Sequence, residues 1–241
     1  MKFKHKIEKA LSELLFKKTI NLAEDKAFVT FTFDDAPLSA FVNGGDILKK
    51  HGLNGTYYIS MSLLNREGYF TSSDLKNALE QGHELACHTF SHLHSFNTSG
   101  KRLYQDVLKN EEAFQQIFPH QPLLNYSFPF GEQTILSRRL TKNRFKSSRG
   151  ITTGINRGKI DLNNLKAIKL YESTNSIQSI RQELKDLKAN GGWLIFYTHD
   201  VQNNFSEYGC STEYFEEVVK SVLQLDIKCF NIKEGISCIS D

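Results

Sequence analysis

Two adjacent carboxylates follow an apolar run near the start of the chain. Residues 27–33 read AFVTFTF, and Asp34 and Asp35 come directly after them. Aromatic and β-branched residues predict a buried strand here. Neighbouring strand residues point to opposite faces, so the two acids reach one cavity only if the chain bends after the strand. Two buried acids need a cation or a catalytic task to offset their burial. From this stretch alone, a turn in which Asp35 caps a helix is an equal alternative.

Histidines follow two later apolar runs. His88 and His92 stand four residues apart after residues 84–87, and His199 follows residues 193–198. Two histidines and one carboxylate form a metal site that leaves positions open for water and substrate. Such a pair also arises by chance, and His94 shows that this stretch is simply rich in histidine. Together with the strand-end acids, however, the pair predicts a metal centre.

The spacing also tests two other classes of metalloenzyme. In the zincin pattern a glutamate follows the first histidine, whereas Thr89 follows His88. A non-haem iron oxygenase uses the same two-histidine, one-carboxylate ligand set and stays open as an alternative. An oxygenase site of this kind would give no role to the second acid or to His199.

The elements that would position these residues alternate along the chain. Apolar segments predict strands at residues 27–35, 55–60, 84–88, 123–128, 144–149, 167–171, 193–198 and 227–232. Helical periodicity predicts helices at residues 39–51, 73–81, 101–118, 134–142, 177–189 and 213–225. Alternation of this kind predicts parallel strands in a barrel or a doubly wound sheet, with the site at their carboxyl ends. The acids and histidines stand at such ends, as does Pro129-Phe130-Gly131.

Composition limits the classes of function. A chain of 241 residues fits one large α/β domain, and a net charge of +3 gives no reason to propose nucleic-acid binding. The four cysteines are scattered and form no CxxC pair, as is typical of a reduced, intracellular protein. Charges interrupt every apolar run of residues 1–18, so this segment is neither a signal peptide nor a transmembrane span. We therefore expect a cytoplasmic protein.

The first segment has a pattern of its own. Residues 3–18 place apolar residues at helical spacing with lysines between them. We expect residues 1–26 to contribute an amphipathic helix packed on the barrel, and residues 27–241 to form a single catalytic domain. A basic amphipathic helix can also lie on an anionic membrane surface, so peripheral membrane contact is the alternative. The sequence indicates no particular oligomeric state.

At this point the motifs match a family. The chain resembles the polysaccharide deacetylases with a NodB-type domain (carbohydrate esterase family 4). The likeness rests on Thr32-Phe33-Asp34-Asp35, on His88-Thr-Phe-Ser-His92, on Phe128-Pro129-Phe130-Gly131 and on the strand before His199, in this order over residues 25–232. It implies an α/β fold, a distorted (β/α) barrel of seven to eight strands, and hydrolysis of an N-acetyl group on an amino sugar.

The resemblance also implies a role for each site residue. Three residues would bind a divalent ion, most often zinc: Asp35, His88 and His92. Asp34 would act as general base, His199 as general acid that protonates the leaving amine, and the backbone N–H of Phe130 would hold the oxyanion. Physical chemistry supports this assignment, because a metal with open positions lowers the pKa of its bound water toward about 7.

Two features of the family's pattern are missing. The third motif usually carries an arginine that steers the base aspartate, but residues 125–127 read Asn-Tyr-Ser. The fourth motif, an Asp-rich stretch with Trp that tunes the acid histidine, is not recognisable. Arg149 is a candidate for replacing the arginine, and Asp161 or Asp200 for assisting His199.

The function we expect is removal of an acyl group, acetyl by analogy, from an N-acetylated amino sugar. A cytoplasmic location favours a nucleotide-, lipid- or oligosaccharide-linked precursor of a surface polysaccharide. The missing motifs leave a non-catalytic glycan-binding or scaffold protein with a degenerate barrel as one alternative. A deacylase of a non-sugar amide is another. The retained Asp34 argues against a binding protein, because a buried carboxylate without a catalytic role is costly.

Overall fold

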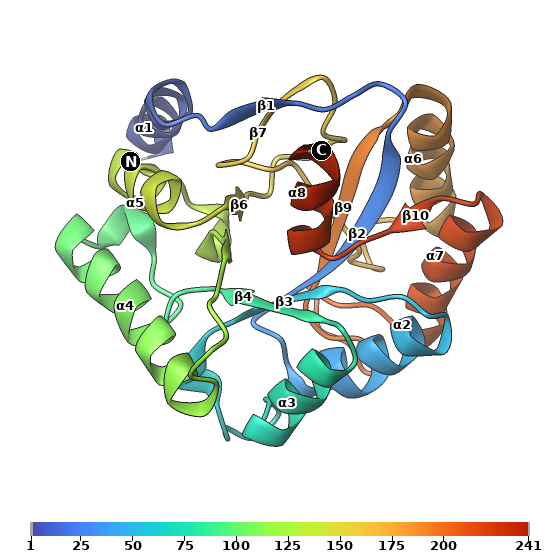
Figure 1. Ribbon diagram of the computed structural model, residues 1–241, viewed down its shortest axis with the longest axis horizontal. Coiled ribbons are helices and arrows are strands. Elements are labelled where there is room, and N and C mark those ends of the chain that lie inside the picture. Colours follow the sequence, from blue (N-terminus) through green and yellow to red (C-terminus); the bar gives the residue numbers. More distant parts are fainter. Residues whose placement is uncertain (1, 241) are drawn as a thin grey trace.

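A curled parallel sheet surrounded by helices forms the body of the molecule (Figure 1). The computed structural model describes the backbone of residues 2–240, without the side chains of residues 2–6, 9 and 240. The strands of the main sheet are β2 (Ala27–Asp34), β3 (Thr56–Ile59), β4 (Glu84–Cys87), β5 (Asn125–Ser127), β6 (Ser147–Arg149), β8 (Ile168–Lys169), β9 (Gly192–Thr198) and β10 (Lys228–Cys229). The helices are α1 (Lys2–Leu15), α2 (Asp46–Lys50), α3 (Ser72–Glu80), α4 (Gly100–Ile117), α5 (Ile135–Arg144), α6 (Ile177–Asn190), α7 (Thr212–Gln224) and α8 (Ile232–Ser240).

The order of the strands confirms the predicted fold class. Seven strands follow one another as β6-β5-β4-β3-β2-β9-β8, and β10 pairs with β2. The pairs within this sheet are parallel. The result is a half-barrel with its strand ends gathered at one mouth, the expected arrangement for residues that share a site.

Strand β2 lies inside the sheet between β3 and β9, and both of its faces are covered. It pairs with β9 over seven positions, from Ala27 beside Gly192 to Phe33 beside Thr198. Alternate side chains enter two cores: Phe31 and Phe33 lie in one, and Phe28 lies in the other. Burial on both faces explains the continuous apolar run that preceded the two acids.

Helix α8 covers the amino ends of the strands. Lys233 donates its backbone N–H to the buried carboxylate of Glu84, at the amino end of β4. Residues 227–232 were expected to be one strand, but only β10 pairs, and α8 begins at Ile232. The reason is a capping box, in which Asn231 and Glu234 exchange backbone and side-chain hydrogen bonds.

A short antiparallel ribbon was not predicted from the sequence. It consists of β1 (Thr19–Asn21) and β7 (Lys159–Asp161), and it lies beside α1 along one side of the molecule (Figure 1). Three-residue strands with alternating exposure give too short a pattern to be recognised.

Helix α1 packs against α5, but not with the face that its sequence suggested. Ser12 is buried, and the carbonyl of Phe16 accepts hydrogen bonds from Arg138 and Asn163. The apolar stripe of the helix is exposed instead. The buried Ser12 and the hydrogen bonds to the Phe16 carbonyl hold the helix against the protein. The expected boundary at residue 26 between this segment and the catalytic domain stays a prediction. Among the described residues, no helix is both long and apolar enough to span a membrane.

Candidate active site

The chain bends sharply where β2 ends. Asp35 and Ala36 have φ values of 55° and 47°, in the left-handed region that residues other than glycine seldom adopt. Asp34 stays in the strand and is buried, whereas Asp35 turns toward the loop after β4. This is the bend that the sequence required for both acids to reach one cavity.

Asp35 meets the two predicted histidine ligands. Its Oδ1 lies 3.8 Å from His88 Nε2 and 3.5 Å from His92 Nε2. One ligand atom of each residue lies within 4.8 Å of the other two. Atoms that share one zinc ion at about 2 Å each lie up to about 4 Å apart, so the distances from Asp35 to the two histidines suit a common ion.

The state of these three side chains also fits a divalent ion. His88 Nδ1 lies 2.9 Å from the carbonyl of Ser127 and donates to it, which leaves the lone pair of Nε2 facing Asp35. Burial lowers the pKa of His88 to about 3, and burial also lowers the pKa of His92, so both rings are neutral. Asp35 Oδ1 is buried without a hydrogen-bond partner. Two neutral imidazoles and a carboxylate are the donors that zinc prefers.

Asp34 is held by an arginine from another strand. The guanidinium of Arg149, on β6, donates to both carboxylate oxygens of Asp34, and Ser127 Oγ lies 3.4 Å from Oδ1. Burial is the largest single influence and would raise the pKa of Asp34. The charge and hydrogen bonds of Arg149, with smaller contributions from His88 and His199, together outweigh it, so this pKa falls to about 2. By contrast, burial raises the pKa of Asp35 to about 6, and the Asp34 charge adds to the rise.

Arg149 itself is fixed in place. It is fully buried, its Nη1 donates to the Gly150 carbonyl at 2.9 Å, and its guanidinium lies over the rings of Tyr58 and Tyr197. Ser127 on β5 is its register partner. Ser127 belongs to the motif that lacks the expected arginine, and it lies directly beside Arg149, the arginine that contacts Asp34.

His199 faces the acids from the end of β9. Its Nε2 lies 4.0 Å from Asp35 Oδ2, and its Nδ1 lies 3.3 Å from the carbonyl of Tyr208. The two aspartates expected to assist it are engaged elsewhere, so that expectation is wrong. Asp200 accepts hydrogen bonds from Ser206 within its own loop, and Asp161 pairs with Arg138. A backbone carbonyl takes their place, and sequence patterns do not reveal such an acceptor.

The turn after β5 brings Phe130 beside the ligands. Phe130 has φ 56° in the turn Pro129–Gly131, and its ring centroid lies 4.3 Å from that of His92. The half-exposed ring stacks on His94, which pairs with Glu132. The use of its backbone N–H as an oxyanion donor stays a prediction.

Two tyrosines that the sequence did not single out line the other side. The rings of Tyr171 and Tyr208 lie 5.9 Å and 5.5 Å from the His199 ring. Tyr171 ends the predicted strand 167–171, so its strand-end position was the available signal. With Phe130 they give the mouth aromatic walls.

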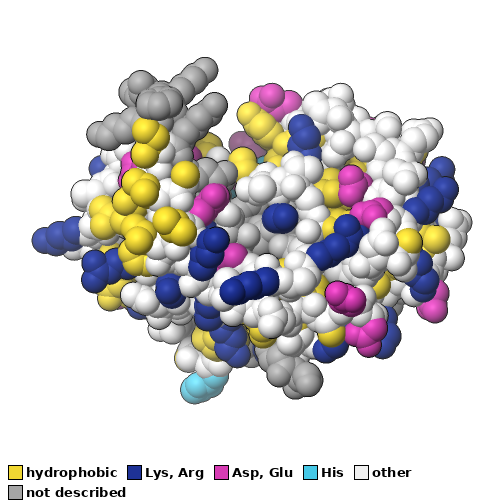
Figure 2. Space-filling view, turned by 90° about the horizontal axis from the view of Figure 1, so that it is seen from above, with side chains coloured by type: hydrophobic (Ala, Val, Ile, Leu, Met, Phe, Trp, Pro, Cys, Tyr) yellow, Lys and Arg dark blue, Asp and Glu magenta, His cyan; other side chains and the backbone are white. Residues whose placement is uncertain are grey.

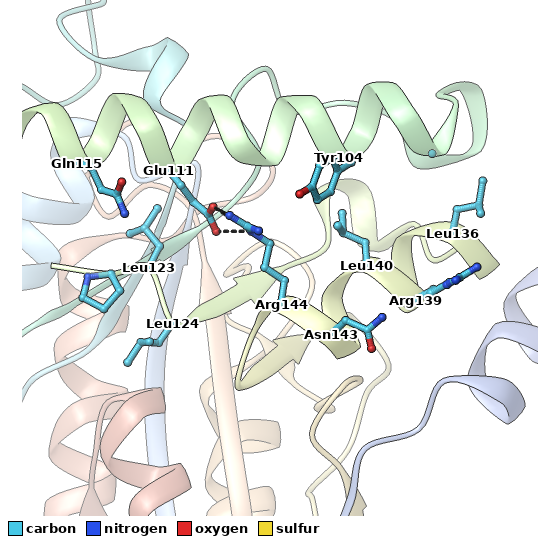
Figure 3. A pocket seen from close by; sticks show the side chains of 12 residues that line it. Tyr104, Glu111, Gln115, Leu123, Leu124, Leu136, Arg139, Leu140, Asn143 and Arg144 are labelled. Carbon is cyan, nitrogen blue, oxygen red and sulfur yellow. Dashed lines mark hydrogen bonds and ion pairs between the residues drawn. The ribbon is translucent and has the colours of Figure 1, made fainter. Parts of the chain in front are cut away.

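A cavity of the described structure lies away from these residues. A hollow of about 670 Å³ separates α4 from α5, with the ion pair of Glu111 and Arg144 inside it (Figure 3). Its lining combines leucine side chains with polar and charged ones, and Tyr104 and Arg139 lie toward one end (Figure 3). Neither the strand-end acids nor the histidines line it, so this cavity is separate from the candidate active site.

The ligand set leads to a first prediction about metal binding. Protein stripped of metal should bind one Co²⁺ and give the visible absorption of a low-coordinate Co²⁺ site. His92→Ala removes one of three ligands and should weaken binding at least about tenfold. The control His94→Ala removes the next histidine along the chain and should bind Co²⁺ like the wild type. Equal loss of binding in both variants would contradict the ligand set.

Comparison with known proteins shows similarity in sequence and in fold. The family model for polysaccharide deacetylase matches residues 21–144. A peptidoglycan-N-acetylglucosamine deacetylase of Bacillus cereus (strain ATCC 14579) is 27% identical over 107 residues, which cover 44% of this chain and 48% of the relative. The match thus spans about half the length of that relative.

Solved structures share the fold over most of the chain. Peptidoglycan deacetylase PdaC from Bacillus subtilis superimposes with a TM-score of 0.62 and 16% identity, covering 90% of this chain and 92% of its own. A CE4 family pseudoenzyme from Bacillus anthracis also reaches 0.62, at 12% identity, covering 89% of this chain and 66% of its own. At such identities the likeness shows the fold alone.

Proposed function

Because the chain belongs to the polysaccharide deacetylase family, we propose that it is a metal-dependent hydrolase that removes an N-acetyl group from an amino sugar. One observation carries the proposal. An ionised carboxylate, Asp34, lies next to a three-residue ligand set and is held there by a buried arginine. A structural role alone would not require two acids and two histidines at one mouth.

The metal would be held by Asp35, His88 and His92. When bound, a divalent ion such as zinc supplies a Lewis acid that activates water and polarises the acyl oxygen. The remaining chemistry belongs to side chains of this chain. Asp34, ionised because Arg149 holds its pKa at about 2, accepts the proton of the attacking water.

The second half of the reaction needs a proton donor on the opposite wall. His199 lies there, with Nδ1 directed at the Tyr208 carbonyl and Nε2 directed at the acids. From this position it protonates the amine as the bond to the acyl carbon breaks. The backbone N–H of Phe130, in its strained turn, stabilises the developing oxyanion.

The proposed substrate is an N-acetylated amino sugar linked to a nucleotide, a lipid or an oligosaccharide. The name of the Bacillus cereus relative, a peptidoglycan-N-acetylglucosamine deacetylase, supports the sugar class. The aromatic walls formed by Phe130, Tyr171 and Tyr208 suit the apolar face of a sugar ring. We propose a cytoplasmic precursor rather than mature wall material, and the scattered cysteines, all free here, support this location.

Acetate release tests the proposal. Protein loaded with Zn²⁺ or Co²⁺ should release acetate from at least one member of a panel of nucleotide-linked, lipid-linked and oligomeric N-acetylamino sugars. Chelation should abolish release, and returning the metal should restore it. A metal-loaded protein that releases nothing from the whole panel would overturn the proposal.

A non-catalytic glycan-binding protein is the second candidate. The absence of two family motifs favours it. Glycan binding that is unchanged by chelation, without acetate release, would support it. The pairing of Asp34 with Arg149 supports the enzyme instead, because it keeps a base ionised beside the ligands.

A further inference from the structure

The apolar stripe of α1 faces away from the protein. Four aliphatic side chains of this helix are exposed: Ile7 (47%), Leu11 (45%), Leu14 (69%) and Leu15 (57%). The helix is held to the body through its opposite face, where Ser12 is buried. A contiguous exposed apolar stripe on a helix marks a surface that another molecule covers.

Basic side chains lie near the carboxyl-terminal end of α1. Lys17, just after α1, shares a hollow of about 260 Å³ with three other cations, which are all exposed: Arg157, Lys159 and Lys166. Glu13 and Asp161 also line it. Because Arg157 pairs with Asp186 and Asp161 pairs with Arg138, three lysines lie against one further acid and positive charge is in excess.

Both features lie on one side of the molecule. Figure 2 views the side where Figure 1 places α1, β1 and β7. Hydrophobic side chains gather there over α1, and Lys and Arg side chains, with Asp and Glu side chains among them, spread across the rest of this surface (Figure 2). We call this surface, made of the α1 stripe and the four cations, the docking face.

We propose that the docking face binds the surface of an anionic phospholipid bilayer. Helices that lie in the membrane interface combine an apolar face with flanking lysine and arginine, as this face does. Each cation near an anionic membrane adds to the attraction. A two-fold dimer on the same face is disfavoured, because it would bring Lys17, Lys159 and Lys166 of the two copies close together.

This attachment is independent of the proposed reaction. The stripe and the cations contain none of the acids or histidines of the site, so either proposal can fail alone. Attachment would keep the enzyme beside substrates that are linked to lipid.

Vesicle sedimentation tests the docking face. The full chain should bind vesicles of phosphatidylcholine with phosphatidylglycerol, should not bind vesicles of phosphatidylcholine alone, and should be released by high salt. The double substitution Leu14→Gln and Leu15→Gln removes the two most exposed stripe residues and should weaken binding at least about tenfold. Replacing Lys159 and Lys166 by glutamine should weaken binding and reduce its dependence on salt.

A matched control separates this effect from general loss of surface leucine. Leu223→Gln, on α7 and 39% exposed, should bind vesicles like the wild type. Acetate release from a soluble conjugate should stay the same in all these variants. Absence of vesicle binding, or binding that survives the α1 substitutions, overturns the proposal. A dimer in light scattering that these substitutions dissociate, without vesicle binding, shows instead that a second copy covers the face.

Discussion

The Asp34→Asn variant is expected to lose roughly 10²- to 10⁴-fold in kcat, the usual contribution of a general base. Asparagine has nearly the same shape as aspartate and can still accept a hydrogen bond from Arg149, but it cannot take a proton. Metal binding should persist, because Asp35, His88 and His92 are unchanged. The measurement is acetate release under saturating substrate, together with Co²⁺ absorption on the same preparation.

Loss of the charge on Asp34 also leaves a buried guanidinium without its counter-ion, and this lowers stability. A second variant separates stability from chemistry. Asp34→Asn combined with Arg149→Gln pairs two neutral amides, so much of the stability should return while activity stays low. Activity near the wild-type level in either variant would exclude Asp34 as the base.

The sequence was sufficient for the fold and for the grouping of the site. Alternating strand and helix patterns predicted a parallel sheet, and the carboxyl ends of such strands must meet. Asp35, His88 and His92 therefore had to approach one another, and the structure brings them together. Each of these residues could be placed because its position follows from the strand just before it.

Lateral contacts between strands could not be predicted in the same way. Arg149 lies 115 positions from Asp34, and their contact depends on β6 lying beside β5 in the register that pairs Arg149 with Ser127. The sequence named Arg149 as a candidate for replacing the missing arginine, and the structure confirms its contact with Asp34, but no sequence pattern gave the register that makes this contact possible. The carbonyl of Tyr208 that faces His199 was still harder to predict, because every residue has a main-chain carbonyl and the residue type does not show which one will accept a hydrogen bond. The exposure of the α1 stripe could not be predicted either, because it depends on which face of the helix packs against the rest of the protein.

Transferring the arginine from residue 149 on β6 to residue 127 on β5 should restore the stability and the activity that are lost when Arg149 is removed. Arg149→Ser leaves Asp34 buried without its cation, so we expect a loss of about 3–5 kcal/mol in the free energy of unfolding, together with a large fall in kcat. Urea denaturation measures the first quantity, and acetate release measures the second. Arg157→Ser is the matched control, because its ion pair with Asp186 is partly exposed and should contribute at most about 1 kcal/mol.

The exchange variant Ser127→Arg with Arg149→Ser distinguishes a positioning role from simple loss of packing. Register partners on neighbouring strands lie about 5 Å apart and project from the same face of the sheet, so a long side chain from residue 127 can reach Asp34. The exchange should recover most of the lost stability and a substantial part of kcat, whereas Ser127→Arg alone should crowd a second cation against Arg149 and destabilise the protein. An exchange variant no better than Arg149→Ser would mean that the packing of Arg149 between Tyr58 and Tyr197, rather than its charge beside Asp34, is what the site requires.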